Sequence, residues 1–296
     1  MGLGVDSSGI TLLSGAKRLG VDFTRTLTLG RQEFFPRRSE LKDVFKHMGV
    51  QENAEDFLRA NGYADGFFRL LGAQELMSLD YSTYEGATII HDLNEPLPAK
   101  WRETATVVFD GGTLEHVFNI PQALRTCMEL VTIGGHFIQV TMANNFLGHG
   151  FWQLSPELVF RTFARENGFE TSVVLLHEVI SGGRWYQVVD PAEAKSRVQL
   201  CNCQPTCMLT IAKRVARVEM FSRPPLQSDY QAAWSGTSDF APVYAPAPSY
   251  RRMVPEFLVR ALKPLVRDWS LFGLGWDQKY FRRLDAAAVA QGRFTR

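Results

Sequence analysis

The sequence lacks several features that would place it in a specialised class of protein. It has only four cysteines, and three of them form the cluster Cys201-Asn-Cys203-Gln-Pro-Thr-Cys207. This spacing contains no Cys-x-x-Cys pair, so it does not predict a zinc site, and a reduced protein is expected. No apolar run approaches the ~20 residues of a membrane-spanning helix, and residues 1–20 lack the apolar segment of a signal peptide. We therefore expect a cytoplasmic protein without a membrane partner.

An excess of charge of either sign is also missing. Lysine and arginine together number 32, and aspartate and glutamate together number 31. Nucleic-acid-binding domains usually carry a clustered basic face, so this balance argues against a nucleic-acid partner. The hydrophobic fraction of 45% over 296 residues is typical of a globular chain with one large domain and an extension.

A third absence concerns dinucleotide binding. Nicotinamide-binding folds have a G-x-G-x-x-G motif after the first strand and an acidic residue ~20 positions later. Here the first predicted strand, residues 26–32, contains only Gly30, and the acid that ends the next strand, Asp80, lies 50 positions after it. The sequence therefore argues against a nicotinamide-dependent enzyme.

What the sequence does contain is an alternation of short apolar strands with helical segments. This alternation predicts an α/β fold, a doubly wound Rossmann-like sheet of seven mostly parallel strands. No helix is evident between the last two strands, so the last strand is expected to be antiparallel. The strands are predicted at 26–32, 76–80, 87–92, 106–110, 136–141, 171–179 and 208–212, with helices at 7–20, 120–131 and 155–167.

The domain, residues 1–218, is expected to carry a helical insertion at about 39–72. That stretch is longer than a single crossover helix requires. Residues 219–296 are predicted to form a C-terminal extension, with a Pro-rich strap over 222–250 and helices at 251–267 and 276–290. The predicted helix N-caps are Ser7 or Ser8, Ser39 and Asn53, and Gly134-Gly135 is expected to end the helix at 120–131.

Polar residues follow several of these strands where each strand ends. The strand beginning Val107-Val-Phe runs into Asp-Gly-Gly-Thr-Leu-Glu-His-Val117. Ligands of open α/β sheets bind outside the carboxyl ends of the strands. Asp80 is therefore placed to accept a hydrogen bond from a ribose diol, and Asp92 from an adenine amino group. For each acid, the competing interpretation is that it caps a neighbouring turn.

Four short motifs occur in order over residues 106–169: Phe109-Asp110, Leu114-Glu115-His116-Val117, Gly134-Gly135-His136-Phe137-Ile138 and Asn167-Gly168-Phe169. Together they resemble the later half of a class I S-adenosylmethionine-dependent methyltransferase. The similarity to this family extends over roughly residues 24–215. The first loop departs from the family, which usually has an acid and three alternating glycines, because Thr28-Leu29-Gly30-Arg31-Gln32 has one glycine and no acid.

The resemblance implies S-adenosylmethionine as the cofactor and methyl transfer to an oxygen of a small molecule or saccharide. The alternative is a non-catalytic methyltransferase-like protein that acts as a binding or scaffold subunit. The residues implied in cofactor binding are Gly30 and Gln32 at the methionine end, Asp80 and Tyr81 at the ribose, Asp92 and Leu93 at the adenine, and Asp110 and Gly111.

The segment Asn144-Asn-Phe-Leu-Gly-His-Gly-Phe-Trp-Gln153 follows the fifth strand, so it is expected to face the same edge of the sheet. Two glycines flank His149, which favours a defined loop shape over a helix. Methylation of a hydroxyl needs a base, and histidine titrates near neutral pH. His149 is the first candidate for the base and His116 the second, with a purely structural histidine as the competing interpretation of each.

A divalent metal held by Asp110, Glu115 and His149 is a weaker hypothesis, since carboxylates and imidazole are suitable ligands but no spacing fixes their geometry. The identity of the acceptor and homo-oligomer formation stay open at the level of sequence.

Overall fold

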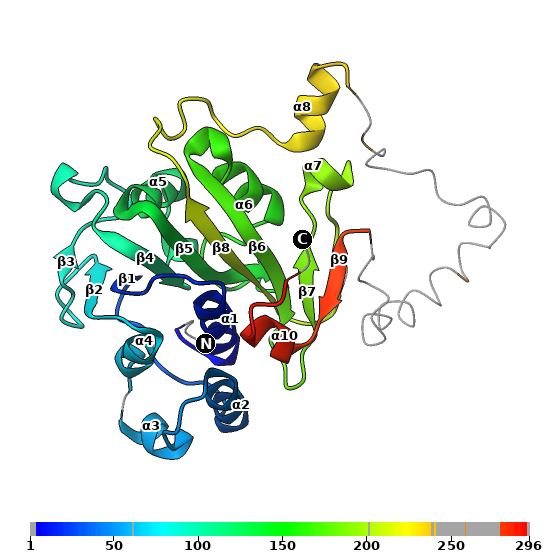
Figure 1. The fold of residues 1–296 in the computed structure, drawn as a ribbon. Coiled ribbons are helices and arrows are strands. Elements are labelled where there is room, and N and C mark those ends of the chain that lie inside the picture. Colours follow the sequence, from blue (N-terminus) through cyan, green and yellow to red (C-terminus); the bar gives the residue numbers. More distant parts are fainter. Residues whose placement is uncertain are drawn as a thin grey trace.

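The computed structural model describes residues 4–60, 62–200, 202–237, 240, 258 and 279–294. Its described strands form one nine-stranded sheet in the order β3-β2-β1-β4-β5-β8-β6-β7-β9 (Figure 1). Strands β1 to β5 are mutually parallel, and β8 is antiparallel to both β5 and β6. The strands are β1 (Arg25–Leu29), β2 (Glu75–Asp80), β3 (Ile89–Ile90), β4 (Ala105–Gly111), β5 (Val131–Asn144), β6 (Phe169–Glu178), β7 (Trp185–Val188), β8 (Thr206–Arg214) and β9 (Phe281–Leu284).

This arrangement confirms the doubly wound, mostly parallel α/β sheet, but the predicted number of seven strands was wrong. Strand β7 lies where the sequence was interpreted as a loop, and β9 lies inside the predicted helix 276–290. Each pairs antiparallel with its neighbour, β7 with β6 and β9 with β7. Both strands are four residues long, too short for a period-2 pattern to identify them.

Helices cover both faces of the sheet (Figure 1). One face packs against α5 and α6, and the other against α1, α2, α4 and α10, with α3 packed on α2. In β4 the side chain of Val108 belongs to the first core, whereas Val107 and Phe109 belong to the second. The helices are α1 (Ser7–Arg18), α2 (Arg38–Met48), α3 (Ala54–Ala60), α4 (Asp65–Leu71), η1 (Ala99–Trp101), η2 (Leu114–His116), α5 (Ile120–Leu130), α6 (Pro156–Thr162), η3 (Arg165–Asn167), α7 (Pro191–Ala194), α8 (Ser228–Trp234) and α10 (Ala286–Ala290).

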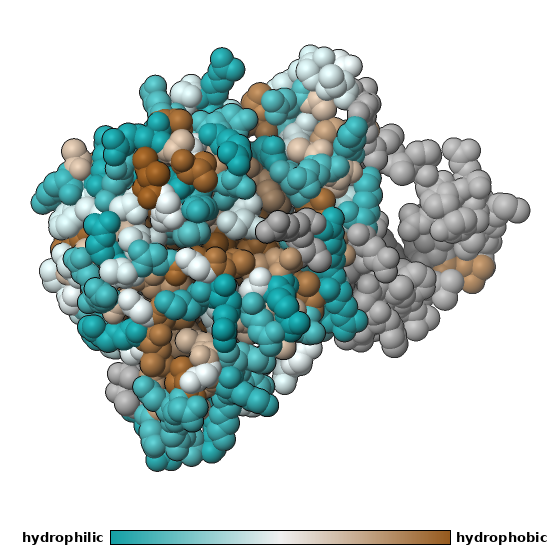
Figure 2. Space-filling model, viewed as in Figure 1, coloured by the Kyte–Doolittle hydropathy of each residue, from teal (hydrophilic) through white to brown (hydrophobic). Residues whose placement is uncertain are grey.

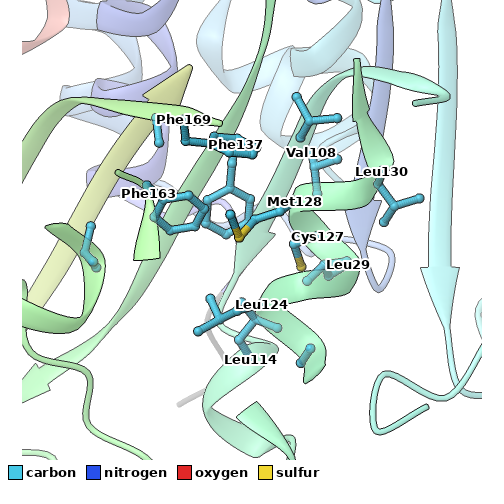
Figure 3. Close-up of a cluster of buried hydrophobic side chains, with 14 of the residues drawn as sticks. Leu29, Val108, Leu114, Leu124, Cys127, Met128, Leu130, Phe137, Phe163 and Phe169 are labelled. Atoms are coloured by element: carbon cyan, nitrogen blue, oxygen red, sulfur yellow. The ribbon is translucent and has the colours of Figure 1, made fainter. Parts of the chain in front are cut away.

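Helix α5 fixes the loop that leaves β4. Its residues Leu124, Cys127 and Met128 recur at helical spacing and face the sheet, where Phe137 of β5 is fully buried (Figure 3). The ring of Phe137 stacks on that of Phe163, with centroids 4.8 Å apart. Full burial of one such side chain contributes about 2–3 kcal/mol. The short η2 turn between β4 and α5 is therefore held at both ends by well-packed elements.

The predicted helical insertion is confirmed, because α2, α3 and α4 all lie between β1 and β2. The Asn53 side chain accepts a hydrogen bond from the Glu55 backbone N–H, as expected of an N-cap. Ser39 is not an N-cap, because α2 already begins at Arg38 and its preceding residue makes no side-chain cap bond.

Three further local predictions differ from the structure. The N-cap of α1 is Asp6, whose carboxylate accepts from the Gly9 N–H, so Ser7 and Ser8 lie inside the helix. Gly134 and Gly135 lie within β5 and do not end α5. A Cβ at Gly135 would come 2.7 Å from the Thr106 carbonyl oxygen, so the glycine permits close approach of β4 and β5 where their register shifts. The helix predicted at 155–167 is divided into α6 and η3.

The C-terminal extension contributes to the main sheet. Strand β9 adds to β7, and α10 packs against α1 (Figure 1). Helix α8 lies within the predicted strap, so the strap is not extended throughout. The helix predicted at 251–267 lies, apart from Leu258, outside the described residues. On the face drawn in Figure 2, hydrophobic patches are interrupted by hydrophilic side chains, and none of the described helices is long and apolar enough to cross a membrane.

Candidate functional site

The carboxyl ends of β1, β2 and β4 meet at Gly30. A Cβ built on this glycine would lie 3.8 Å from Asp80 Oδ2 and 3.9 Å from Thr113 Oγ1. The Thr113 hydroxyl donates to the Leu29 carbonyl at 2.9 Å, which ties the loop after β4 to the end of β1. Gly30 has φ +68°, a conformation that costs an L-residue about 1–2 kcal/mol. The single glycine of the first loop therefore occupies the position where three strand ends converge.

Gln32 lies over Gly111 at the same edge of the sheet. Its Nε2 donates to the Leu29 carbonyl at 2.5 Å, while its buried Oε1 has no hydrogen-bond partner. A Cβ at position 111 would lie 2.0 Å from that oxygen, so a larger residue there would displace the Gln32 side chain. An unsatisfied buried acceptor costs about 1–3 kcal/mol, which an N–H donor from a bound ligand would recover.

Asp80 is the last residue of β2, and one of its carboxylate oxygens is hydrogen-bonded to the adjacent backbone. Its Oδ1 accepts from the Tyr81 backbone N–H at 2.6 Å, and its Oδ2 is the oxygen beside Gly30. The Tyr81 side chain is 75% exposed. The structure therefore brings Asp80 to Gly30, whereas the Tyr81 ring is largely in solvent.

Asp92 follows β3 and caps the turn after it. Its Oδ1 accepts from both the backbone N–H and the side-chain amide of Asn94, at 2.8 Å each. These bonds hold the pKa of Asp92 below its ordinary value. The neighbouring Leu93 is buried. One carboxylate oxygen of Asp92 therefore caps the neighbouring turn, as the competing interpretation of this residue predicted.

Asp110 is fully buried at the end of β4. Its Oδ1 accepts from the Thr113 backbone N–H at 2.8 Å, and its Oδ2 accepts from Gln139 Nε2 at 2.8 Å. Burial raises its pKa to about 6, although these hydrogen bonds oppose the shift. The Asp110 carboxylate therefore orders the loop that leads into η2, with both oxygens bonded inside the protein.

Glu115 and His149 form a pair on the far side of that loop. The Glu115 side chain is 0% exposed, and its Oε2 accepts from Thr141 Oγ1 at 3.0 Å. Its Oε1 lies 3.8 Å from His149 Nε2, and both atoms are buried without a hydrogen-bond partner. Burial, and then the charge of Asp110, raises the pKa of Glu115 to about 8. Burial, and then His116, lowers the pKa of His149.

The His149 loop is fastened to η2 through its backbone. The N–H groups of Phe151 and Trp152 donate to the Glu115 carbonyl at 2.8 and 3.2 Å. Gly150 has φ +68°, and a Cβ there would lie 2.7 Å from the same carbonyl oxygen. The His116 ring packs edge-on to that of His149, with centroids 4.9 Å apart. The structure therefore brings His149, His116 and Glu115 together.

The candidate ligands for a metal differ from those expected. Among the described residues, the group of acidic, cysteine and histidine side chains that could hold an ion is Glu115, His116 and His149, with ligand atoms within 4.8 Å of one another. Asp110 of the expected set is replaced by His116. Thr141 and Gln139, which position the carboxylates, were missed because strand-interior polar residues carry no distinctive sequence signal.

Exposed aromatic rings flank this cluster. Phe118, two residues after His116, is 72% exposed, and Phe151, two residues after His149, is 68% exposed. Their rings form an edge-to-face pair with centroids 5.9 Å apart. An apolar surface is therefore available next to the polar cluster.

No protein-family model matches the chain, and no curated protein matches it. Among solved structures, it is similar to a putative methyltransferase from Bacillus halodurans (12% identity, TM-score 0.38, 68% of this chain and 99% of that one). It is also similar to 1,6-didemethyltoxoflavin-N1-methyltransferase from Burkholderia thailandensis (10% identity, TM-score 0.34, 70% and 79%). A third is the branched-chain polyamine synthase from Thermus thermophilus (16% identity, TM-score 0.36), where the match covers 74% of this chain and 60% of that one.

Similarities at these TM-scores do not bear on activity, and the fold follows from the strand order itself. A parallel β3-β2-β1-β4-β5 core continued by an antiparallel β8 and then β6 is observed directly. The chain therefore has a Rossmann-like α/β fold, which does not by itself determine an activity.

Proposed function

We propose that the protein is an S-adenosylmethionine-dependent methyltransferase that acts on an oxygen of a small molecule or saccharide. The observation that carries this proposal is the convergence of three features at one edge of the sheet. Gly30 adopts φ +68°, Asp80 Oδ2 lies beside it, and Gln32 Oε1 is a buried acceptor without a partner.

The residues at this edge fit the polar groups of the cofactor. Asp80 Oδ2 would accept from the ribose diol, since its other oxygen is already bonded to Tyr81 N–H. Gln32 Oε1 would accept from the ammonium of the methionine part, which satisfies the unpartnered oxygen. Asp92, with Leu93, is assigned to the adenine. The Asp110 side chain is assigned a role in ordering the loop after β4, because both of its carboxylate oxygens accept hydrogen bonds from within the protein.

The cofactor, when bound, would supply a methyl group from its positively charged sulfur to the acceptor oxygen, and the electron pair of the broken carbon–sulfur bond would stay on sulfur. The hydroxyl proton must leave, and His149 is the first candidate to take it, with His116 second. Glu115 Oε1 lies 3.8 Å from His149 Nε2 and would orient the imidazole if the two groups closed to hydrogen-bond distance. The exposed rings of Phe118 and Phe151 offer an apolar face for positioning the acceptor.

Calorimetry with S-adenosylhomocysteine tests the proposal without knowledge of the acceptor. Gly30→Ala and Gly49→Ala form a matched pair, because both glycines have positive φ and neither Cβ would clash. Each substitution should cost about 1–2 kcal/mol of folding stability. Only Gly30→Ala, whose methyl points between Asp80 and Thr113, should weaken binding, by at least ~10-fold or about 1.4 kcal/mol.

Wild-type protein that shows no binding at millimolar S-adenosylhomocysteine would refute the methyltransferase proposal. The non-catalytic binding or scaffold protein would then be the better description. Equal loss of affinity in the two glycine variants would refute the location of the site.

A further inference from the structure

The cluster of Glu115, His116 and His149 contains unsatisfied polar atoms that base catalysis alone does not explain. Glu115 Oε1 and His149 Nε2 are both buried, and neither has a hydrogen-bond partner. At 3.8 Å they are too far apart for a hydrogen bond to each other. Burial of two polar groups that face each other without a hydrogen bond costs folding free energy, unless a bound ligand lies between them in the functional state.

We propose that Glu115, His116 and His149 bind one divalent first-row transition-metal ion. Among the described residues they are the group whose candidate ligand atoms all lie within 4.8 Å of one another. The residues come from η2 and from the loop after β5, so the ion would join two segments that are already fastened by backbone hydrogen bonds.

The geometry needs only small adjustments. Ligand distances of about 2.0–2.2 Å in a tetrahedral site place ligand atoms roughly 3.3 Å apart. The Glu115 Oε1 to His149 Nε2 separation of 3.8 Å would close by about half an ångström. His116 is exposed, and its candidate ligand atom already lies within 4.8 Å of those of Glu115 and His149. Thr141, which donates to Glu115 Oε2, already holds the carboxylate in place as an outer hydrogen-bond partner.

The ligand types select the class of metal. Two imidazoles and one carboxylate suit Zn²⁺, Co²⁺ or Fe²⁺, whereas Mg²⁺ and Ca²⁺ favour all-oxygen sites. Three protein ligands also leave a coordination position open, as in catalytic sites.

The role of the ion, unlike its binding, rests on the proposed methyl transfer. An acceptor hydroxyl bound at the open coordination position of the ion would become more acidic, so that its proton would pass to water instead of to a free His149 imidazole. The bonds made and broken at the methyl carbon stay the same, and the ion is neither oxidised nor reduced.

Titration of EDTA-treated, full-length protein with Co²⁺ tests the site through its visible d–d absorption. We expect one Co²⁺ per chain, displaced by Zn²⁺. His116→Ala and His149→Ala should each weaken binding at least ~10-fold. His136→Ala is the matched control, because His136 lies near the amino end of β5, away from the loop that follows this strand, and it should bind Co²⁺ like wild type.

Because His116 is exposed, the His116→Ala variant should fold normally. Absence of the d–d band in wild type, or an unchanged band in both His116→Ala and His149→Ala, would overturn the metal site. Calorimetry with S-adenosylhomocysteine on the same preparations separates the two proposals. Co²⁺ binding without S-adenosylhomocysteine binding refutes methyl transfer alone, and the reverse result refutes the metal site alone.

Discussion

The contact between Gly150 and the Glu115 backbone makes a sharp test of how the site is assembled. A methyl group at position 150 would lie 2.7 Å from the Glu115 carbonyl oxygen, whereas ordinary contacts begin near 3.4 Å. Relief of that overlap in Gly150→Ala requires the loop to move by about 0.7 Å. That movement carries His149 away from Glu115.

The expected loss of stability follows from the same contacts. A non-glycine residue at φ +68° costs about 1–2 kcal/mol. Displacement of the loop weakens the hydrogen bonds from the Phe151 and Trp152 N–H groups to the Glu115 carbonyl, each with a net value of about 1 kcal/mol. The free energy of unfolding should therefore fall by roughly 3 kcal/mol.

Gly148→Ala is the matched control, because this glycine lies on the other side of His149 and has no positive φ, and no atom lies within 4 Å of the place that its methyl group would take. It should change stability by less than about 0.5 kcal/mol. Urea denaturation followed by tryptophan fluorescence distinguishes the Gly150→Ala and Gly148→Ala variants. With an m-value of about 3 kcal/mol/M, the loss of stability in Gly150→Ala lowers the urea midpoint by about 1 M. Equal midpoints for the two variants would refute the assigned contact.

Two further predictions concern the rest of the fold. His177 is buried, and desolvation, followed by the charge of Arg37, lowers its pKa to about 3. Below pH 6.5 the unfolded chain therefore takes up a proton at His177 that the folded chain does not, so this residue should contribute a loss of about 2 kcal/mol of stability between pH 7 and pH 5. The stability difference between wild type and His177→Gln in urea titrations should change by that amount over this range, and a difference that does not change with pH would contradict this reasoning. Phe137→Ala should cost about 3–5 kcal/mol through loss of core packing, whereas exposed Phe118→Ala should leave the thermal midpoint nearly unchanged; similar midpoints would argue against the packing in Figure 3.

The long-range pairing of the sheet shows where sequence reasoning reaches its limit. The β4 strand was predicted correctly because Val107, Val108 and Phe109 are buried on both faces and form a continuous apolar run. Strand β9 was missed because Phe281–Leu284 pairs with Trp185–Val188, far away in the chain. A four-residue strand is stabilised mainly by such a partner and by burial, and neither is encoded in local propensity.

The strand-end acids illustrate a second limit. Asp80, Asp92 and Asp110 have the same local signature, an acid after an apolar strand. In the structure Asp80 keeps one oxygen beside Gly30, Asp92 caps its own turn, and Asp110 is fully buried. The direction and solvation of each carboxylate depend on the neighbouring strand and loop, so sequence alone could not separate these three roles.

The sequence by itself determined the α/β class, the parallel core and the edge of the sheet where polar residues collect, because these follow from local hydrophobic patterns and strand ends. Only the tertiary structure decided which polar side chains meet there. Glu115 and His149 belong to different segments, and their contact depends on the left-handed turn at Gly150 and on backbone hydrogen bonds across two loops. Such contacts arise from packing between distant segments, which no local pattern in the chain specifies.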